Sequence, residues 1–295
     1  MRTILSIILC IPGFIYSQEY FLLDSLKTDF KVNEYVLNTQ DIYDINKDIN
    51  IYNVFISENK ILLLSVLPDL GEKILPRMNE KGQNWEVIGY EKIKNNLFSK
   101  NQIQNMLQEW QLNDSPENKT LKYKLVKKEG ETYYVSKVCL TELFNITDLK
   151  FPLISSYGTI NISEPKISIK QMQEVFKKQI PNEEFIMDVR NNNFLRNTDV
   201  PYSFRNYLSK EYNVKGNKAY QFWTFDGWWI QDGYNEYRGI DRFLYIQGKG
   251  VVGGSYDFYF RFRPKIVSEN YFTISTNALW NNIINEKIMV AKELK

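Results

Sequence analysis

Histidine is absent from this chain of 295 residues. Its absence excludes Ser-His-Asp and Cys-His catalysis, zinc or haem held by imidazole, and histidine acid-base chemistry. Only two cysteines occur, so a thiolate metal cluster and a disulfide scaffold are excluded as well. The chemistries that remain use carboxylate pairs, serine with lysine, or calcium, and we expect no cofactor.

Neither sign of charge is in clear excess, because 37 basic side chains stand against 35 acidic ones and the formal net charge is +2. This balance gives no electrostatic reason to bind nucleic acid or an anionic membrane surface. The chain is 43% hydrophobic and 15% aromatic, which excludes an intrinsically disordered protein. We therefore expect a globular protein with a sizeable core.

The first residues have the pattern of a secretory signal peptide. Arg2 supplies the positive charge, and residues 4–16 form an apolar stretch that is shorter than the about 20 residues needed to span a bilayer. Ser17 is the small residue at the expected cleavage site. We predict export to the periplasm or the exterior after cleavage near Ser17, with no transmembrane segment in the mature chain. A lipoprotein that begins at Cys10 is the alternative, and the bulky Leu9 argues against it.

Two further features concern the single cysteine of the mature chain and the source of the protein. Removal of residues 1–17 would leave Cys139 as its single cysteine, within a run typical of a strand. We expect a buried, unreactive thiol there, because a catalytic cysteine would lack a histidine base. Abundant Asn, Ile, Lys and Tyr are typical of AT-rich coding and indicate a bacterial source.

Strand patterns dominate the chain. Residues 51–57 and 61–67 flank a short turn and predict a hairpin, whose second strand is apolar throughout and should be covered on both faces. A second hairpin is expected from Leu121 to Leu140, with its turn at Glu129-Gly130. The region from Ala219 to Thr276 has the densest strand signals. There we expect tight turns at Asp226-Gly227 and Asp232-Gly233, strands at 242–247 and 256–263, and a glycine-rich turn at 248–254.

Helices are fewer. Ser99 with Gln102 and Ser168 with Gln171 form capping boxes before apolar residues at helical spacing, and Pro181 should end the second helix. A third helix is expected from about Asp199, with Pro201 in its first turn and with its inward face formed by Phe204, Tyr207 and Leu208. An amphipathic helix that docks on its own domain is expected from Thr276 to Leu294.

Together these patterns predict an α+β fold with a largely antiparallel sheet or sheets and about four amphipathic helices, including a C-terminal one. The predicted organisation is a signal peptide at 1–17, an N-terminal α+β region at 18–150, and a C-terminal α+β region at 151–295 that is rich in aromatic hairpins. The boundary is placed in the proline-containing stretch 151–165. A single continuous domain is the alternative.

Three motif matches are interpreted as structural. Residues 248–253 match G-x-G-x-x-G, but a strand pattern follows them where a helix is required, so we expect a hairpin turn or bulge. Ser57–Lys60 and Ser163–Lys166 match S-x-x-K, but the first lies in a turn, the second contains proline, and no K-T-G follows. Asp44, Asn46, Asp48 and Asn50 alternate like calcium ligands. Ile49 and Phe55 stand where that loop needs glycine and a closing acid, so we expect a solvated loop or strand edge.

The remaining constellation combines aromatic rings with acids around the two Asp-Gly turns. Rings stack on the C–H faces of sugars, and carboxylates accept hydrogen bonds from sugar hydroxyls. Two such carboxylates could also hydrolyse a glycosidic bond without histidine. The predicted ligand-binding residues are Trp223, Asp226, Trp228, Trp229, Asp232, Tyr234 and Glu236, with Asn235 and Asp241 beside them.

We predict a binding or structural component of the cell envelope rather than an enzyme, with a glycan or an envelope protein as its partner. One alternative is a hydrolase that uses a carboxylate pair from the same segment. The other is a protein-interaction module that docks through an aromatic sheet face at residues 256–262.

Overall fold

The computed structural model describes residues 18–69, 84–112, 119–150, 158–179, 181–182, 205–225, 239–262 and 274–295. Their strands form three sheets, called here the central, small and C-terminal sheets. The pairs are antiparallel except for β1 with β7 and β10 with β9, which are parallel. Helices pack against these sheets, so the predicted α+β fold is confirmed. Among the described helices, none is long and apolar enough to cross a membrane.

The central sheet has the strand order β10-β9-β4-β3-β2, with β6 also paired to β9. The predicted hairpin is confirmed as β3 and β4, which join through a turn at Glu58-Asn59. As expected, β4 is covered on both faces: Ile61 and Leu63 belong to one apolar cluster, Leu62 and Leu64 to another. The strands are β2 (Lys31–Asn38), β3 (Asp48–Ser57), β4 (Lys60–Leu67), β6 (Lys119–Thr120), β9 (Val138–Thr147) and β10 (Thr159–Asn161).

The small sheet has the order β1-β7-β8-β5 and lies beside the central sheet with the N-terminal helices. The hairpin expected between 121 and 140 is present as β7 and β8, and Gly130 in its turn has φ +59°. Its elements and the adjoining helices are β1 (Tyr20–Leu22), α1 (Leu23–Asp29), β5 (Trp85–Ile88), α3 (Tyr90–Ile93), α4 (Lys100–Leu112), β7 (Lys124–Glu129) and β8 (Thr132–Ser136). The short α2 (Gln40–Tyr43) connects β2 to β3.

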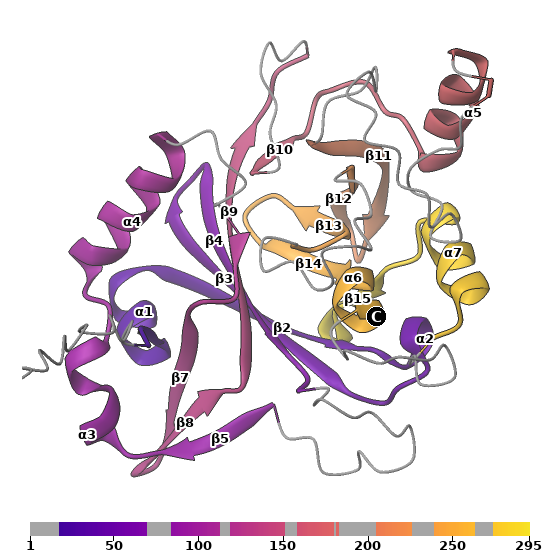
Figure 1. The fold of residues 1–295 in the computed structure, drawn as a ribbon. Helices are drawn as coiled ribbons and strands as arrows, with labels where there is room; N and C mark the ends of the chain where they lie inside the picture. Colours follow the sequence, from indigo (N-terminus) through magenta and orange to yellow (C-terminus); the bar gives the residue numbers. More distant parts are fainter. Residues whose placement is uncertain are drawn as a thin grey trace, which may run out of the picture.

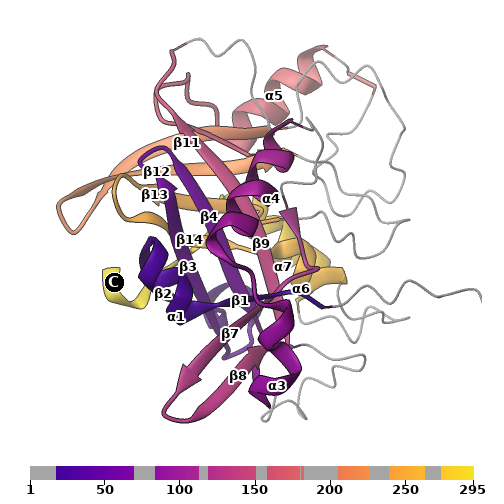
Figure 2. The ribbon, with the colours of Figure 1, turned by 90° about the vertical axis from the view of Figure 1, so that its left-hand side faces the viewer.

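The C-terminal sheet has the order β11-β12-β13-β14-β15. In Figures 1 and 2 the strands of the central sheet lie between α1 and α4 on one side and the C-terminal sheet with α6 and α7 on the other. The elements are α5 (Ile169–Gln179), β11 (Arg205–Val214), β12 (Asn217–Phe225), β13 (Arg242–Ile246), β14 (Gly250–Ser255), α6 (Asp257–Phe262), α7 (Thr276–Ile284) and β15 (Met289–Val290).

Both predicted capping boxes are confirmed. At α4, the Gln102 amide donates to the Ser99 hydroxyl (3.3 Å) and the Ser99 amide donates to the Gln102 side-chain oxygen (2.9 Å). Ser168 and Gln171 make the same reciprocal pair at α5 (3.2 and 2.8 Å). Helix α5 ends at Gln179, shortly before Pro181. Each box satisfies amides that the first helical turn leaves unpaired.

The helix expected from Asp199 is wrong in its described part, where residues 205–214 form strand β11. Tyr207 and Leu208 are buried as predicted, but so are their neighbours Asn206 and Ser209. Where a strand is covered on both faces, apolar and polar residues do not alternate along it. The buried residues of β11 were therefore interpreted as one face of a helix.

The strand expected at 256–263 is also wrong, because Asp257–Phe262 form helix α6. Tyr256, Phe258, Tyr259 and Phe260 are all buried, so burial does not alternate along this segment. Their uniform burial removes the alternation of apolar and polar residues that would otherwise distinguish a strand from a helix in the sequence. Tyr256, Phe258 and Phe260, which belong to the face proposed for protein docking, are therefore inside the fold.

The C-terminal helix is confirmed but ends at Ile284, ten residues before Leu294. Ser275 caps its start by accepting a hydrogen bond from the Ala278 amide (3.2 Å). Glu286 adopts a left-handed φ of +52°, which no helix can continue through. Met289 and Ala291 are buried beyond this point, in and next to strand β15.

The central and C-terminal sheets are joined by a large apolar cluster that draws residues from both. Asn53 in β3 adds a polar contact inside this interface. Its amide nitrogen donates to the Val251 carbonyl (2.8 Å), and its oxygen accepts from the Val251 amide (2.7 Å). A methyl group on Gly250, which has φ +90°, would lie 2.3 Å from the Asn53 oxygen. The glycine therefore lets Asn53 approach β14 as closely as a neighbouring strand would.

We predict that Asn53→Ala lowers the free energy of unfolding by about 2–3 kcal/mol, because both backbone groups of Val251 lose their partner while buried. Urea denaturation measures the change. The matched control is Asn59→Ala in the exposed β3–β4 turn, which should cost less than about 0.5 kcal/mol. Equal effects of the two substitutions would show that the contact to Val251 contributes no stability.

Candidate functional site

The predicted ligand-binding residues fall at the end of β12 and on the connection from β12 to β13. Of these seven, Trp223 is described; Asp226, Trp228, Trp229, Asp232, Tyr234 and Glu236 lie outside the described residues, as do Asn235 and both Asp-Gly turns. Their arrangement as a site therefore stays a prediction. The structure does describe the two ends of this connection and the residues that hold them.

Trp223 is fully buried in β12. Its indole N–H donates to the Ile167 carbonyl (2.8 Å), and its ring stacks on Tyr207 with centroids 4.9 Å apart. Phe225 meets the same indole edge-on at 6.0 Å. These contacts give Trp223 a packing role, and its ring offers no exposed face to a sugar.

The ends of the connection are fixed side by side. The Thr224 amide donates to the Asp241 carbonyl (2.8 Å), and the Thr224 hydroxyl contacts the Asn206 side-chain oxygen (2.8 Å) and the Ile240 carbonyl (3.0 Å). Asn206 in turn donates to the Thr159 carbonyl (3.1 Å). A segment that leaves β12 at residue 225 and returns at residue 239 therefore has both ends anchored at the same end of the β12–β13 pair.

Glu142 in β9 holds the returning end and was not recognised from the sequence. Its two carboxyl oxygens accept the Ile240 amide at 3.0 and 3.2 Å. Burial raises its pKa to about 7, against the opposing effects of Lys119 and of the Ile240 amide. The one available signal was a charged residue in the mostly apolar run from Cys139 to Phe144. A charged side chain that is buried there needs a hydrogen-bonding or charged partner.

A buried ion pair lies next to this junction. Arg242 in β13 forms a salt bridge with Asp257 at the start of α6, and both side chains are at most 1% exposed. The Tyr43 hydroxyl donates to Asp257 (2.9 Å) and accepts from the Tyr256 amide (2.5 Å), while Arg242 also donates to the Lys287 carbonyl (3.0 Å). Burial and then the Asp257 charge raise the pKa of Tyr43, so its hydroxyl remains a donor. Each guanidinium nitrogen of Arg242 and each carboxyl oxygen of Asp257 thus has a hydrogen-bond partner, and the pair connects α2, β13 and α6.

Two more buried acids connect segments of the chain by accepting backbone amides elsewhere in the C-terminal half. Glu164 accepts the Leu208 amide (2.7 Å) and pairs with Arg205 (2.5 Å). Glu286 accepts the Ile169 amide (2.7 Å) and bonds the Ser209 hydroxyl. Each acid ties a loop or helix start to β11.

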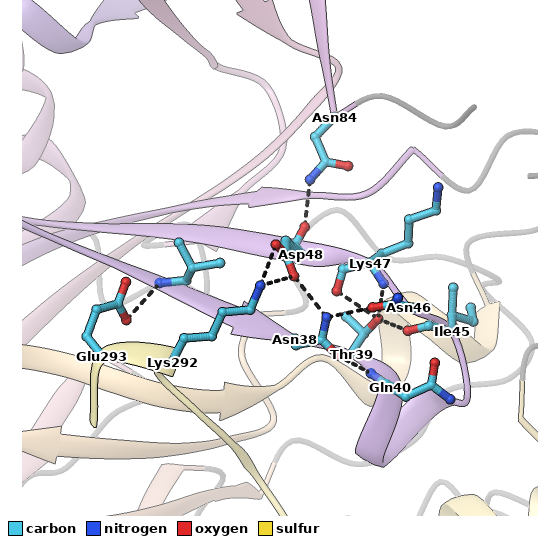
Figure 3. A network of polar contacts seen from close by, with 11 residues as sticks. Asn38, Thr39, Gln40, Ile45, Asn46, Lys47, Asp48, Asn84, Lys292 and Glu293 are labelled. Carbon is cyan, nitrogen blue, oxygen red and sulfur yellow. Dashed lines mark hydrogen bonds and ion pairs between the residues drawn. The ribbon is translucent and has the colours of Figure 1, made fainter. Parts of the chain in front are cut away.

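The calcium-like spacing does not form a cation site in the structure. The ammonium of Lys292 lies against both carboxyl oxygens of Asp48 (2.8 and 2.7 Å), and Asn38 donates to Asp48 and to Asn46 at 2.9 Å each (Figure 3). Burial opposes ionisation of Asp48, but the bonds from Lys292 and Asn38 outweigh it and lower its pKa. Among the described residues, no cluster of acids or cysteine is arranged to hold a metal ion.

The other motif matches are structural. In the first S-x-x-K match, Ser57 ends β3 and its hydroxyl bonds Asn59 (2.8 Å) in the β3–β4 turn. In the second, Ser163 bonds Asp148 and Lys166 pairs with Glu211 (3.1 Å).

The first residues of the glycine motif form the predicted hairpin turn between β13 and β14. From Gly250 onward the motif belongs to strand β14. Gly248 and Gly250 have φ of +73° and +90°. The side chains of Lys31 and Asn33 bind the carbonyls of the turn, at 3.1 Å to Gly248 and 3.1 Å to Lys249 respectively. The turn thus packs on strand β2.

No protein family model, no curated protein and no solved structure matches this chain.

Asp257→Asn should lower the free energy of unfolding by about 3–5 kcal/mol, because it leaves the buried Arg242 charge without its carboxylate. Thermal or urea unfolding measures the change. Asp41→Asn, which removes an exposed partner of Lys295, is the matched control and should change stability by less than about 1 kcal/mol. A cost for Asp257→Asn as small as that of the control would contradict the structural role of the pair.

Cys139 is fully buried in β9, as predicted, and burial raises its pKa to about 12. We expect the native thiol to resist a disulfide reagent such as DTNB at pH 8, while protein unfolded in urea reacts completely within the mixing time. Rapid labelling of the native protein would show that the thiol is accessible and that the β9 core opens readily.

Proposed function

We propose that the protein is an exported, non-enzymatic component of a bacterial cell envelope that binds glycan through the segment between β12 and β13. The N-terminal pattern of Arg2, the apolar residues 4–16 and Ser17 supports export. The cluster of aromatic and acidic residues from Asp226 to Glu236 supports a sugar ligand.

The buried acids hold backbone amides and an arginine, and this observation favours binding over catalysis. Among the described residues, four buried carboxylates accept a backbone amide: Glu142 from Ile240, Glu164 from Leu208, Glu286 from Ile169 and Asp241 from Phe258. The fifth buried acid, Asp257, is held by Arg242 and Tyr43. Groups committed to backbone amides in this way position chain segments, and a catalytic acid needs a substrate oxygen within reach instead.

A carboxylate-based hydrolase is the less favoured alternative. Its nucleophile and acid would come from Asp226, Asp232 and Glu236. Glu142 has the raised pKa expected of a general acid, but it is 2% exposed and closed in by Gly239 and Ile240. The buried Glu142 therefore does not contribute to this alternative.

Glycan-array binding tests the proposal directly. The wild-type mature chain should bind a subset of glycans, and Trp229→Ala should reduce that signal at least tenfold. Trp85→Ala on the small sheet is the matched control, because it removes a half-buried indole far along the chain from the segment. No binding by the wild type, or equal binding by Trp229→Ala, would refute glycan recognition at this segment. Hydrolysis of a bound glycan that is lost in Glu236→Gln would favour the enzyme instead.

The export part of the proposal has a separate test. N-terminal sequencing of the protein recovered from the periplasm or medium of an expressing bacterium should give a chain that begins at Gln18. A start at Cys10 with attached lipid would indicate a lipoprotein. Retention of Met1 in the cytoplasmic fraction would refute export by this route.

A further inference from the structure

The junction between β9 and the start of β13 is built around one carboxyl group. Glu142 is 2% exposed, and both of its oxygens face the Ile240 amide. A methyl group on Gly239 would lie 1.9 Å from one of these oxygens and 2.7 Å from Cδ of Lys119. The backbone of residues 239 and 240 is therefore pressed directly against the carboxyl group and the lysine stem, with no space for water between them.

Four elements present titratable or apolar groups to this carboxyl. Lys119 in β6 is the cross-strand partner of Glu142, and Leu63 in β4 is its partner on the other side. Asp241 follows the bound amide at the start of β13, and the hydroxyl of Tyr256, which follows β14, bonds Ser65 in β4 (2.8 Å). The Lys119 charge favours ionised Glu142, whereas the Asp241 charge and burial favour the protonated form.

We propose that this junction is a proton-sensitive latch between the central and C-terminal sheets, tightest when Glu142 is protonated and weaker once Glu142 ionises. A protonated carboxyl still accepts the Ile240 amide on its carbonyl oxygen, so the attachment survives without a buried charge. An ionised carboxyl must be desolvated by the same contacts, which costs free energy even with Lys119 nearby.

The direction of the pH dependence follows from the two environments of Glu142. In the closed junction its pKa is raised to about 7, and in an opened junction it returns towards 4.5, the ordinary value of a solvent-exposed glutamate. Between these values the open form ionises while the closed form keeps its proton. Opening therefore becomes more favourable by up to about tenfold per pH unit as the pH rises, and levels off above the upper value. Acidification strengthens the latch.

Hydrogen exchange of the Ile240 amide measures the opening, because this amide is the one that Glu142 holds. After correction for intrinsic exchange rates, protection in the full-length mature chain should fall by about tenfold or more between pH 5 and pH 7.5. Glu142→Gln should abolish this pH dependence, since an amide does not titrate. Glu34→Gln, which changes an exposed glutamate paired with Lys27, is the matched control and should retain it.

A second variant and a direct titration keep the test decisive if Glu142→Gln fails to fold. Lys119→Met removes the charge that favours ionisation, so the midpoint of the fall in protection should move to higher pH. The carboxyl ¹³C signal of Glu142 in the wild type should titrate well above the pH of an ordinary glutamate. Constant protection from pH 5 to pH 7.5, an unmoved midpoint in Lys119→Met, or an ordinary Glu142 titration would each overturn the latch.

Discussion

Packing of the central sheet against the C-terminal sheet is the contact on which the rest of this structure depends. One apolar cluster contains residues of α2, β3, β4 and β9 together with residues of β11 to β14, α6 and α7. Polar groups cross the same interface at Asn53, at Glu142 and at Tyr43 with Asp257. Because a buried polar group without a partner is costly, these contacts restrict the two sheets to one relative placement.

The residues that make these contacts have structural roles, whereas the segment proposed to bind a ligand is the connection between β12 and β13. Four of the buried acids among the described residues hold backbone amides, and Trp223, the described member of the predicted site, is a packing residue. Thr224 and Glu142 fix the two ends of the connection between β12 and β13. A binding segment placed there would be carried by two paired strands inside the C-terminal sheet, an arrangement common to binding loops on stable scaffolds.

Local signals in the sequence predicted the elements whose turns or ends are marked by nearby residues. The β3–β4 hairpin, both capping boxes and the burial of Cys139 depend on residues within a few positions of one another. Strand β11 and helix α6 were assigned wrongly because residues 206–209 and 256–260 are buried without alternation, so the residues around Tyr207 and Tyr259 did not distinguish a strand from a helix. The role of Glu142 depends on residues about a hundred positions away, which only the tertiary structure brings together. The seven residues of the predicted ligand site were chosen by chemical type, and for Trp223 that choice could not distinguish a core indole from an exposed one.

Native-state hydrogen exchange along strands β3 and β14 measures most directly whether the polar contacts join the sheets into one unit. The amides of Tyr52 and Val251 should exchange with the same free energy of opening and the same denaturant dependence, and both values should fall together in Asn53→Ala. Separate opening free energies for the two strands in the wild type would contradict this and would show two sheets that unfold independently.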